Sequence, residues 1–371
     1  MTEATPAGGG MPSAAQPLFI LAMDHRDSFG RTLFGVTGTA TSDQLARMRS
    51  AKSLIFAGAQ RLAATQPSAG RLGILVDEQL GADVARQVKA AGFVLAMPVE
   101  KSGAEQFTFE YGDDFPRHVE EFDPDWIKAL VRFNPDDPQE LQQAQTAGLR
   151  RLHDWATANR RRWLLELLVP ATREQLAAYE DQASYDEHAR PGLTARVIAS
   201  LTQAGVRPAI WKLEGYETSQ GAQQVLDAVE ASGPPEASCI VLGRDAPRRQ
   251  VDHWLDVAAP LQGYVGFAVG RSIWDKPLAD YLAGRADRDA TEAVIADHYG
   301  HFIEEYMHAD AAPGVAQTRS EPFTYEHPRL TPDREAIIRK AVSGADPRGS
   351  RLPAWMTQTL LAEVDALRAA G

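Results

Sequence analysis

Eight short apolar or β-branched runs recur along the chain, and a stretch with helical periodicity follows each of them. Runs that are apolar on both faces and separated by helices indicate parallel strands covered on both sides. Eight such units within about 250 residues are typical of a (β/α)8 TIM barrel, and a doubly wound open sheet is the alternative. The runs span residues 18–23, 72–77, 93–98, 126–133, 163–169, 209–213, 239–242 and 266–269.

Composition divides the chain into a central barrel and two flanking segments. Residues 1–16 hold Ala, Gly, Pro and Ser without the basic and apolar regions of a signal peptide, so we expect a flexible lead. The barrel is predicted over residues 17–308, with a helix at 42–64 that has Thr41, Ser42 and Asp43 as candidate N-caps, and with a closing helix at 288–308. Residues 309–371 predict a linker and a C-terminal helical extension with amphipathic segments at 332–342 and 353–369.

A long connection follows the third predicted strand. Residues 98–115 show no helical period, and the connection runs to residue 122. In a barrel this loop lies at the carboxyl ends of the strands, where active sites form. A lid over the barrel mouth and an insertion packed on the rim are both consistent with the sequence.

Charge and cysteine content limit the partners and the compartment. With a net charge of -12 and a pI near 5.3, we expect neither nucleic acid nor a membrane surface as a partner. No window reaches the roughly 18 apolar residues that a membrane-spanning helix needs. The single cysteine, Cys239, excludes an intrachain disulfide and fits a reducing compartment. We therefore predict a cytoplasmic protein in which an anionic substrate needs a local basic pocket.

Lys212 stands in an apolar run, Arg207 to Gly215, that predicts a buried strand. An unpaired ammonium in a barrel interior costs several kcal/mol, so this lysine must be paired, neutralised or used. Strand alternation places Lys128, Glu166 and Lys212 on the inward faces of the fourth, fifth and sixth strands. Adjacent strands lie about 4.8 Å apart, so the three side chains can meet if their levels match. An ordinary outward ion pair is the alternative for each residue taken alone.

Such a cluster suits Schiff-base chemistry. A second ammonium nearby disfavours the charged form of Lys212, and a neutral lysine amine attacks carbonyl groups. Glu166 can move the protons that carbinolamine dehydration requires. Asp24, at the end of the first strand, faces the cluster across the mouth and remains as a base for a substrate hydroxyl. His25 adjoins Asp24, and it either hydrogen-bonds substrate or only packs there.

The seventh and eighth strands each end in a Gly-Arg pair, Gly243-Arg244 and Gly270-Arg271. In barrels, the loops after these two strands and a following helix N-terminus form a phosphate cradle. Glycine exposes backbone N–H groups, and arginine adds a bidentate positive charge. The pattern predicts a phosphorylated substrate, with glycine turns and surface arginines as the alternative.

Other sites have less support in the sequence. No glycine-rich nucleotide-binding loop follows a strand. His298 and His301 are spaced as zinc ligands can be, but a solvated face of the closing helix explains them better. We therefore expect neither a metal site nor a cofactor.

Eight segments carry a resemblance to a known family. They are AMDHRDSF at 22–29, LVDEQ at 75–79, LAMPVEKS at 95–102, FEYGDDF at 109–115, LELLVPA at 165–171, WKLEG at 211–215, IVLGR at 240–244 and GFAVGRSIW at 266–274. Over about residues 18–307 the chain resembles the class I aldolase-like domain of the 5-dehydro-2-deoxyphosphogluconate aldolase family, which is often fused to a carbohydrate kinase in myo-inositol catabolism. It is similar, more distantly, to tagatose-bisphosphate and sulfofructose-phosphate aldolases.

The resemblance implies a barrel whose Schiff-base lysine lies on the sixth strand. Matched position by position, it makes Lys212 the nucleophile, Lys128 the second lysine, Glu166 the acid-base group and Asp24 the first-strand aspartate. It assigns phosphate binding to Gly243, Arg244, Gly270 and Arg271. The implied substrate also carries a carboxylate, and our hypotheses for the cation that binds it are Arg26, Arg132 and Lys101.

The implied reaction cleaves 2-deoxy-5-keto-gluconate 6-phosphate to dihydroxyacetone phosphate and malonate semialdehyde. A class I aldolase acting on another ketose phosphate, such as sulfofructose, tagatose or fructose phosphate, is one alternative. A barrel that binds a sugar phosphate without catalysis is another. We also expect a homo-oligomer, and a separate sugar kinase in the same pathway, because the sequence has no kinase portion.

Overall fold

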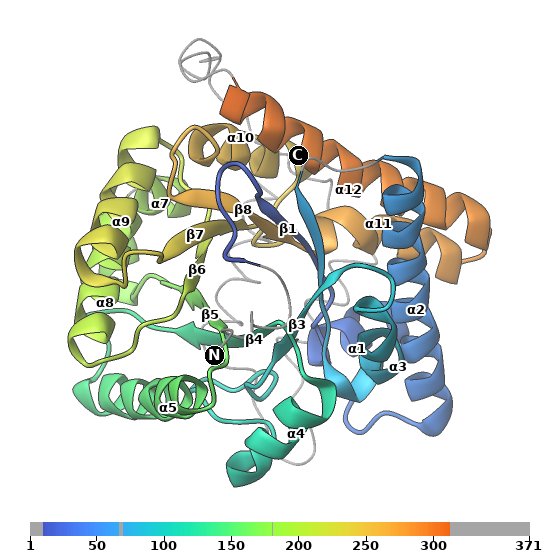
Figure 1. The fold of residues 1–371 in the computed structure, drawn as a ribbon, viewed down its shortest axis with the longest axis horizontal. Coiled ribbons are helices and arrows are strands. Elements are labelled where there is room, and N and C mark those ends of the chain that lie inside the picture. The colour runs from blue at the N-terminus through green and yellow to red at the C-terminus, as the bar shows by residue number, and fades with distance from the viewer. Residues whose placement is uncertain (1–9, 67–69, 180, 312–371) are drawn as a thin grey trace, which may run out of the picture. The chain divides into compact units, whose positions relative to one another are not determined.

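Eight parallel strands close into a barrel in chain order, and the last strand pairs with the first. The computed structural model describes residues 10–66, 70–179 and 181–311 of the 371-residue chain. Figure 1 shows the strands as an inner ring with the helices outside it. The strands are β1 Leu18–Ala22, β2 Arg71–Leu75, β3 Val94–Pro98, β4 Trp126–Arg132, β5 Trp163–Leu168, β6 Ile210–Glu214, β7 Ser238–Leu242 and β8 Tyr264–Val269. The predicted TIM barrel is confirmed, and every strand begins and ends within two residues of its predicted bounds.

Helices alternate with the strands around the outside of the barrel. The predicted helix at 42–64 is α2, and Thr41 caps it in a capping box with Gln44. The other helices are α1 Asp27–Phe34, α3 Glu78–Val88, α4 Phe115–Phe122, α5 Gln139–Ala158, α6 Arg173–Ala177, α7 Gln182–His188, α8 Arg190–Gln203, α9 Ser219–Ser232, α10 Arg248–Ala258, α11 Arg271–Leu282 and α12 Arg288–Ala311.

Three of these elements change the predicted connections. The short helix α1, between β1 and α2, has no counterpart among the predicted helices. The connection after β3 contains the 3-10 turn Gly112–Asp114 and then α4, so only its first part is irregular. The closing helix α12 continues to Ala311, past the predicted boundary at residue 309.

Strand alternation divides the apolar residues into two cores. Leu18, Ile20 and Ala22 of β1 belong to a small cluster of inward-facing side chains inside the barrel. Phe19 and Leu21 of the same strand belong to the large cluster between the barrel and the helices. Because the faces alternate, any strand residue two positions from an interior residue also faces inward.

The interior is covered at the amino ends of the strands. Met11 packs against the interior cluster, and the Arg71 guanidinium donates to the carbonyl of Gly10 at 2.7 Å. Gly10 and Met11, which belong to the predicted flexible lead, therefore contact the barrel. On the outside, the Tyr299 hydroxyl of α12 donates to the Phe19 carbonyl at 2.6 Å and holds this helix against β1.

Residues 312–371, with the predicted extension and its segments 332–342 and 353–369, lie outside the described residues. In the described part of the chain, no helix combines the length and the apolar character that crossing a membrane requires. Cys239 is buried in β7, and burial raises the pKa of its thiol, so it behaves as a small core residue.

Gly266 of β8 is the glycine on which barrel closure depends. Its φ of 132° lies in a region that favours glycine, and a Cβ there would fall against the Leu18 carbonyl of the neighbouring β1. Only a residue without a side chain lets the two strands approach this closely.

We expect Gly266→Ala to lower the free energy of unfolding by about 3 kcal/mol, because the methyl group adds backbone strain and separates β1 from β8. Urea unfolding measures this change. Gly192→Ala in α8 is the matched control, since a Cβ there meets only Gln224 at 3.6 Å. Equal stability of the two variants would contradict this account of closure.

Candidate active site

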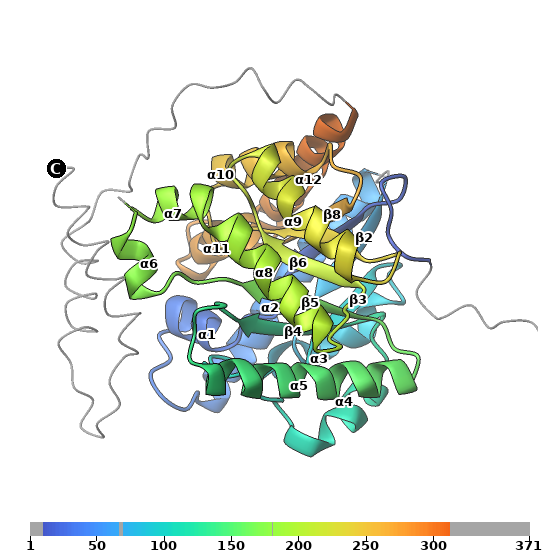
Figure 2. The ribbon, with the colours of Figure 1, turned by 90° about the vertical axis from the view of Figure 1, so that its left-hand side faces the viewer.

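Lys128, Glu166 and Lys212 meet inside the barrel. Each lies two positions after an interior residue, Trp126, Leu164 and Ile210 respectively, and therefore faces inward. Glu166 and Lys212 are direct neighbours in the β5–β6 register, whereas Lys128 lies opposite Leu164, one level lower. In Figure 2 the mouth of the barrel, at the carboxyl ends of the strands, lies on the side of α1, α6 and α7.

The two lysines share one carboxylate oxygen. Glu166 Oε2 lies 2.9 Å from Lys128 Nζ and 3.0 Å from Lys212 Nζ. The backbone levels of the three residues do not all match, but the long side chain of Lys128 reaches up one level, so the three charged groups meet. All three residues are buried, with exposed fractions of 1% for Lys128, 4% for Lys212 and 8% for Glu166.

Lys128 has three carboxylate partners from three separate strand ends. Its Nζ lies 2.8 Å from Asp24 Oδ2, 2.5 Å from Glu100 Oε1 and 2.9 Å from Glu166 Oε2. Lys212 contacts one carboxylate, Glu166. We call these five residues, Asp24, Glu100, Lys128, Glu166 and Lys212, the charged cluster.

Burial and neighbouring charges shift the pKa values of these residues in different directions. Burial disfavours the ammonium of Lys128, but the charges of its three carboxylates outweigh burial and raise the pKa of Lys128. Burial likewise acts to raise the pKa of Asp24 and of Glu166, but the neighbouring lysines dominate and lower both. For Glu100 burial dominates and raises the pKa of the carboxyl, although Lys128 and Arg26 oppose it.

Glu100 is a site residue that sequence reasoning missed. It follows β3 in the segment that resembles the aldolase family, and alternation from Ala96 through Pro98 places it on the inner face. The same period-2 argument that selected Lys128 could therefore have found it. The predicted third strand ends at Pro98, two residues before Glu100.

A second missed residue, Lys52 of α2, supports the end of β1 from outside. It is fully buried and donates to the carbonyls of Met23 at 2.7 Å and His25 at 3.0 Å. It also forms an ion pair with Asp77, at the end of β2. These bonds fix the backbone on both sides of Asp24. The sequence signal was only a lysine within an apolar helical stretch.

The predicted phosphate-binding residues lie in the loops after β7 and β8. A Cβ on Gly270 would lie 2.5 Å from the Ala22 carbonyl, and one on Gly243 would lie 3.1 Å from Val269. Arg244 and Asp245 both have positive φ, 46° and 60°, which bends the β7 loop sharply.

Arg271 begins α11, directly behind Gly270. Its guanidinium contacts Asp245 Oδ2 at 2.9 Å, while its buried Nε has no hydrogen-bond partner among the described residues. The two loops are joined a second time, because Ser272 donates to the Ala246 carbonyl at 2.7 Å. Backbone N–H groups, a helix N-terminus and an arginine thus come together at one point of the mouth.

Arg244 lies in an ion-pair network next to the phosphate-binding loops. Its guanidinium contacts Asp186 at 2.6 Å and Glu214 at 2.9 Å. Asp186 also binds the buried Arg190, and Glu214 accepts a hydrogen bond from the backbone N–H of Val169. This network ties β5, β6, α7 and the β7 loop together, so the contacts of Arg244 are structural.

The three cations predicted for a substrate carboxylate have different surroundings. Arg26 is engaged, because it pairs with Glu110 at 2.8 Å and donates to the Glu100 carbonyl at 2.8 Å. Lys101 is exposed on the hairpin after β3. Arg132 ends β4 on the same inward face as Lys128, is partly exposed, and its guanidinium has no partner in the described part of the chain.

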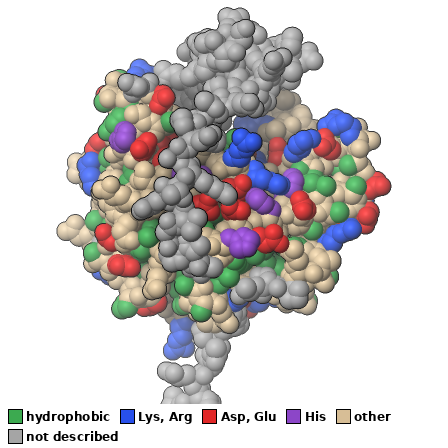
Figure 3. Space-filling model, turned by 90° about the horizontal axis from the view of Figure 1, so that it is seen from above, with side chains coloured by type: hydrophobic (Ala, Val, Ile, Leu, Met, Phe, Trp, Pro, Cys, Tyr) green, Lys and Arg blue, Asp and Glu red, His purple; other side chains and the backbone are tan. Residues whose placement is uncertain are grey.

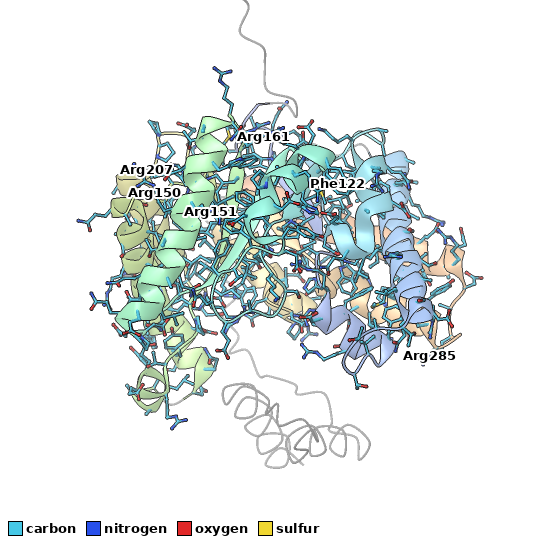
Figure 4. All side chains as sticks on the ribbon, turned by 90° about the horizontal axis from the view of Figure 1, so that it is seen from below. Phe122, Arg150, Arg151, Arg161, Arg207 and Arg285 are labelled. Atoms are coloured by element: carbon cyan, nitrogen blue, oxygen red, sulfur yellow. The ribbon has the colours of Figure 1, made fainter. Side chains whose placement is uncertain are left out.

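Two arginines of α5 are examples of arginines that form ordinary ion pairs on the protein surface. Figure 4 shows Arg150 and Arg151 on α5, on the outside of the barrel. They pair with Asp154 and Asp113 at 2.7 and 2.8 Å and are about half exposed. Figure 3 shows acidic, basic and histidine side chains next to one another on another face rather than in a patch of one sign.

The candidate zinc-ligand pair on α12 has ordinary partners. His298 Nδ1 lies 2.9 Å from the Ile273 carbonyl, and His301 Nε2 lies 2.8 Å from Asp252 Oδ1. His25, at the mouth, has a buried Nδ1 without a partner among the described residues. Its ring packs edge-on against Trp274 with the centroids 5.5 Å apart.

His25 makes stability depend on pH. Burial lowers the pKa of His25 from 6.5 to about 3, although Asp24 opposes this. The unfolded chain therefore binds this proton more readily, and the contribution of neutral His25 to stability is lost as the pH falls from about 6.5 towards 3. The side chain is partly exposed, so solvent reduces the size of the effect.

Between about pH 7 and pH 5, we expect the free energy of unfolding to fall by about 1 kcal/mol less in His25→Gln than in the wild type. Urea unfolding at the two pH values measures this difference. The exposed His188→Gln variant is the control and should follow the wild type. Parallel losses for the wild type and His25→Gln would show that His25 is not held neutral.

Comparison with known proteins identifies a family and a fold. Among solved structures, the chain is similar to a fructose-bisphosphate aldolase from Plasmodium falciparum, crystallised with TRAP and a small-molecule inhibitor, at 12% identity and a TM-score of 0.55 over 82% of this chain and 99% of that one. An archaeal fructose-1,6-bisphosphate aldolase, with its catalytic Lys bound to a carbinolamine intermediate, gives 10% identity and a TM-score of 0.48 over 79% of this chain and 95% of that one.

No curated protein matches the sequence. At these identities, the likeness to the Plasmodium falciparum structure shows the barrel fold alone. A family described as an uncharacterized protein conserved in bacteria (DUF2090) matches residues 10–310. The chain therefore belongs to the DUF2090 family.

Proposed function

We propose that this protein is a Schiff-base, class I aldolase that cleaves a ketose phosphate, with Lys212 as the nucleophile. The observation that carries the proposal is the pair of buried lysines on one oxygen of Glu166, at 2.9 and 3.0 Å. Two amines and a shared carboxylate in a buried site supply a nucleophile, a fixed positive charge and a proton carrier. The similar fold of a fructose-bisphosphate aldolase is consistent with this chemistry.

The contacts favour Lys212 over Lys128 as the nucleophile. Lys128 is held by three carboxylates, and a neutral Lys128 would leave their charges uncompensated in a buried site. Lys212 has one carboxylate partner, which it shares with Lys128. Loss of the Lys212 proton therefore sacrifices less electrostatic energy, and the neutral amine is the form that attacks a carbonyl.

Glu166 can carry the proton in iminium formation. The Lys212 ammonium passes a proton to Glu166 Oε2 across 3.0 Å, and the neutral amine adds to the substrate ketone. Once Lys212 is uncharged, Glu166 has one cation fewer beside it, which favours the protonated carboxyl. Glu166 then gives this proton to the carbinolamine hydroxyl, which leaves as water, and an iminium remains.

Asp24 is the base for carbon–carbon cleavage in this scheme. It accepts the proton of the substrate hydroxyl on the carbon next to the bond that breaks. The electron pair of that bond moves into the iminium to form an enamine, and the hydroxyl-bearing carbon leaves as an aldehyde. Protonation of the enamine and hydrolysis by water then release the ketone product and free Lys212. Lys128, 2.8 Å from Asp24, fixes the position of this base.

The loops after β7 and β8 support a phosphorylated substrate. Gly243 and Gly270 lie in these loops where a Cβ would press against Val269 and the Ala22 carbonyl, and α11, a helix of 12 residues, begins there with Arg271. We assign the substrate as 2-deoxy-5-keto-gluconate 6-phosphate, cleaved to dihydroxyacetone phosphate and malonate semialdehyde. The resemblance of eight sequence segments supports this choice, as does the guanidinium of Arg132, which has no partner among the described residues.

Borohydride reduction in the presence of dihydroxyacetone phosphate tests the proposal. We expect a stable adduct on the peptide that contains Lys212, because reduction traps the imine, and peptide mass analysis locates it. Lys212→Met should form no adduct and should not cleave 2-deoxy-5-keto-gluconate 6-phosphate. Lys276→Met removes an exposed lysine and is the matched control, which should behave as the wild type.

The outcomes separate the parts of the proposal. An adduct on Lys128 would reassign the nucleophile. An adduct on Lys212 without cleavage of this substrate would preserve the chemistry and redirect the search to other ketose phosphates. Folded wild-type protein that forms no adduct would overturn the class I assignment in favour of a non-catalytic sugar-phosphate-binding barrel.

A further inference from the structure

Backbone hydrogen bonds fix the position of Glu100 in the loop after β3. It lies in a hairpin after β3 in which Glu100 bridges to Phe109 and the backbone of Val99 accepts from the N–H of Glu110 at 2.9 Å. The N–H of Val99 donates to the Lys128 carbonyl at 3.0 Å, which ties the hairpin to β4. Arg26 donates to the Glu100 carbonyl at 2.8 Å, which ties it to the end of β1.

The side chain of Glu100 is aimed at Lys128. Its Oε1 lies 2.5 Å from Lys128 Nζ, the shortest of the three carboxylate contacts. Its Oε2 is buried and has no hydrogen-bond partner among the described residues, and only 7% of Glu100 is exposed. Burying a carboxylate that is only half satisfied costs free energy, and Lys128 is the nearest cation that offsets this cost.

The other partners of Lys128 are the groups that exchange protons in the proposed reaction. Glu166 receives a proton from Lys212, and Asp24 receives one from the substrate hydroxyl. At each of these steps Lys128 loses one of its negative neighbours. Among the described residues, Glu100 contacts Lys128 and not Lys212, and it transfers no proton in the proposed reaction, so it is the carboxylate that can compensate for this loss.

We propose that Glu100 is a positioning residue that keeps Lys128 charged and in place at the step in which Asp24 carries a proton, a role that rests on the proposed aldolase function. Asp24 and Glu100 repel one another across Lys128, and this repulsion is part of what disfavours the charged form of Glu100. When Asp24 is protonated the repulsion disappears, and Glu100 supplies the negative charge beside Lys128. Arg26, 3.9 Å from Glu100 Oε1, assists the ionised form.

Lysine NMR tests this role without relying on activity. The chain has seven lysines, so labelling with [13Cε]lysine gives few signals, and Lys128→Met and Lys212→Met assign the two in the site. Asp24→Asn imitates the protonated aspartate. In this variant we expect Lys128 to stay protonated at pH values above the ordinary lysine pKa of about 10.4. In Asp24→Asn/Glu100→Gln we expect its titration to move down by about one to three pH units, because a carboxylate in contact has been removed.

Glu110 provides the matched control. It lies in the same hairpin and pairs with Arg26 but not with Lys128, so Asp24→Asn/Glu110→Gln should leave the Lys128 titration in place. Identical titration of Lys128 with and without Glu100→Gln, or an equal shift with Glu110→Gln, would overturn the proposal. Glu100→Asp is the second variant: it keeps the charge but shortens the side chain, and Lys128 should stay charged in it.

Measurements of kcat and KM distinguish the proposed role of Glu100 from a purely structural one. We expect Glu100→Gln to lower kcat at least about tenfold with little change in KM, because Glu100 acts after substrate is bound, and we expect Glu100→Asp to restore part of the rate. The two proposals fail separately. Absence of a borohydride adduct on Lys212 would overturn the aldolase function, while an adduct together with an unmoved Lys128 titration would overturn only the role of Glu100.

Discussion

The buried ammonium of Lys128 is the interaction on which the mouth of this barrel depends. A charge with an exposed fraction of 1% is tolerated only because carboxylates from the ends of β1, β3 and β5 converge on it. The ion pairs with Glu100 and Glu166 join β4 to its neighbours β3 and β5, and the ion pair with Asp24 at the end of β1 crosses the mouth. They fix the height of Asp24, Glu100 and Glu166 relative to one another, and through Glu166 they fix the environment of Lys212.

The apolar interior of the barrel and the ion pairs around the strand ends stabilise this arrangement. Below the charged cluster the interior is filled by Ala, Val, Leu and Ile side chains and by Trp126, which keep the dielectric low and the charges strongly coupled. Outside the barrel, Lys52 and Asp77 brace the end of β1. At the end of β6, Arg244 forms ion pairs with Asp186 and with Glu214, which lies two residues beyond Lys212. These ion pairs stabilise the end of this strand.

The sequence was a good guide to the strands and to the inner faces of three of them. Lys128, Glu166 and Lys212 were selected because side-chain direction alternates along a strand, and this rule needs no knowledge of the partner strands. The rule failed at Glu100 because the predicted strand ended at Pro98, although the inward alternation continues through the first residues of the hairpin. The ligand roles predicted for Arg26 and Arg244 come from the family resemblance and the Gly-Arg pairs, and neither reveals the carboxylates that these arginines contact in the structure.

Taken by itself, the sequence determined the number and order of the strands, the chemistry available on their inner faces and the glycines of the last two loops. These are local properties, set by periodicity, residue type and backbone conformation. Only the tertiary structure decided which charges meet. Asp24, Glu100 and Glu166 are separated by more than 60 residues along the chain, and barrel closure and register alone bring them to one lysine. The energy of an ion pair depends on distance in space, which periodicity does not encode.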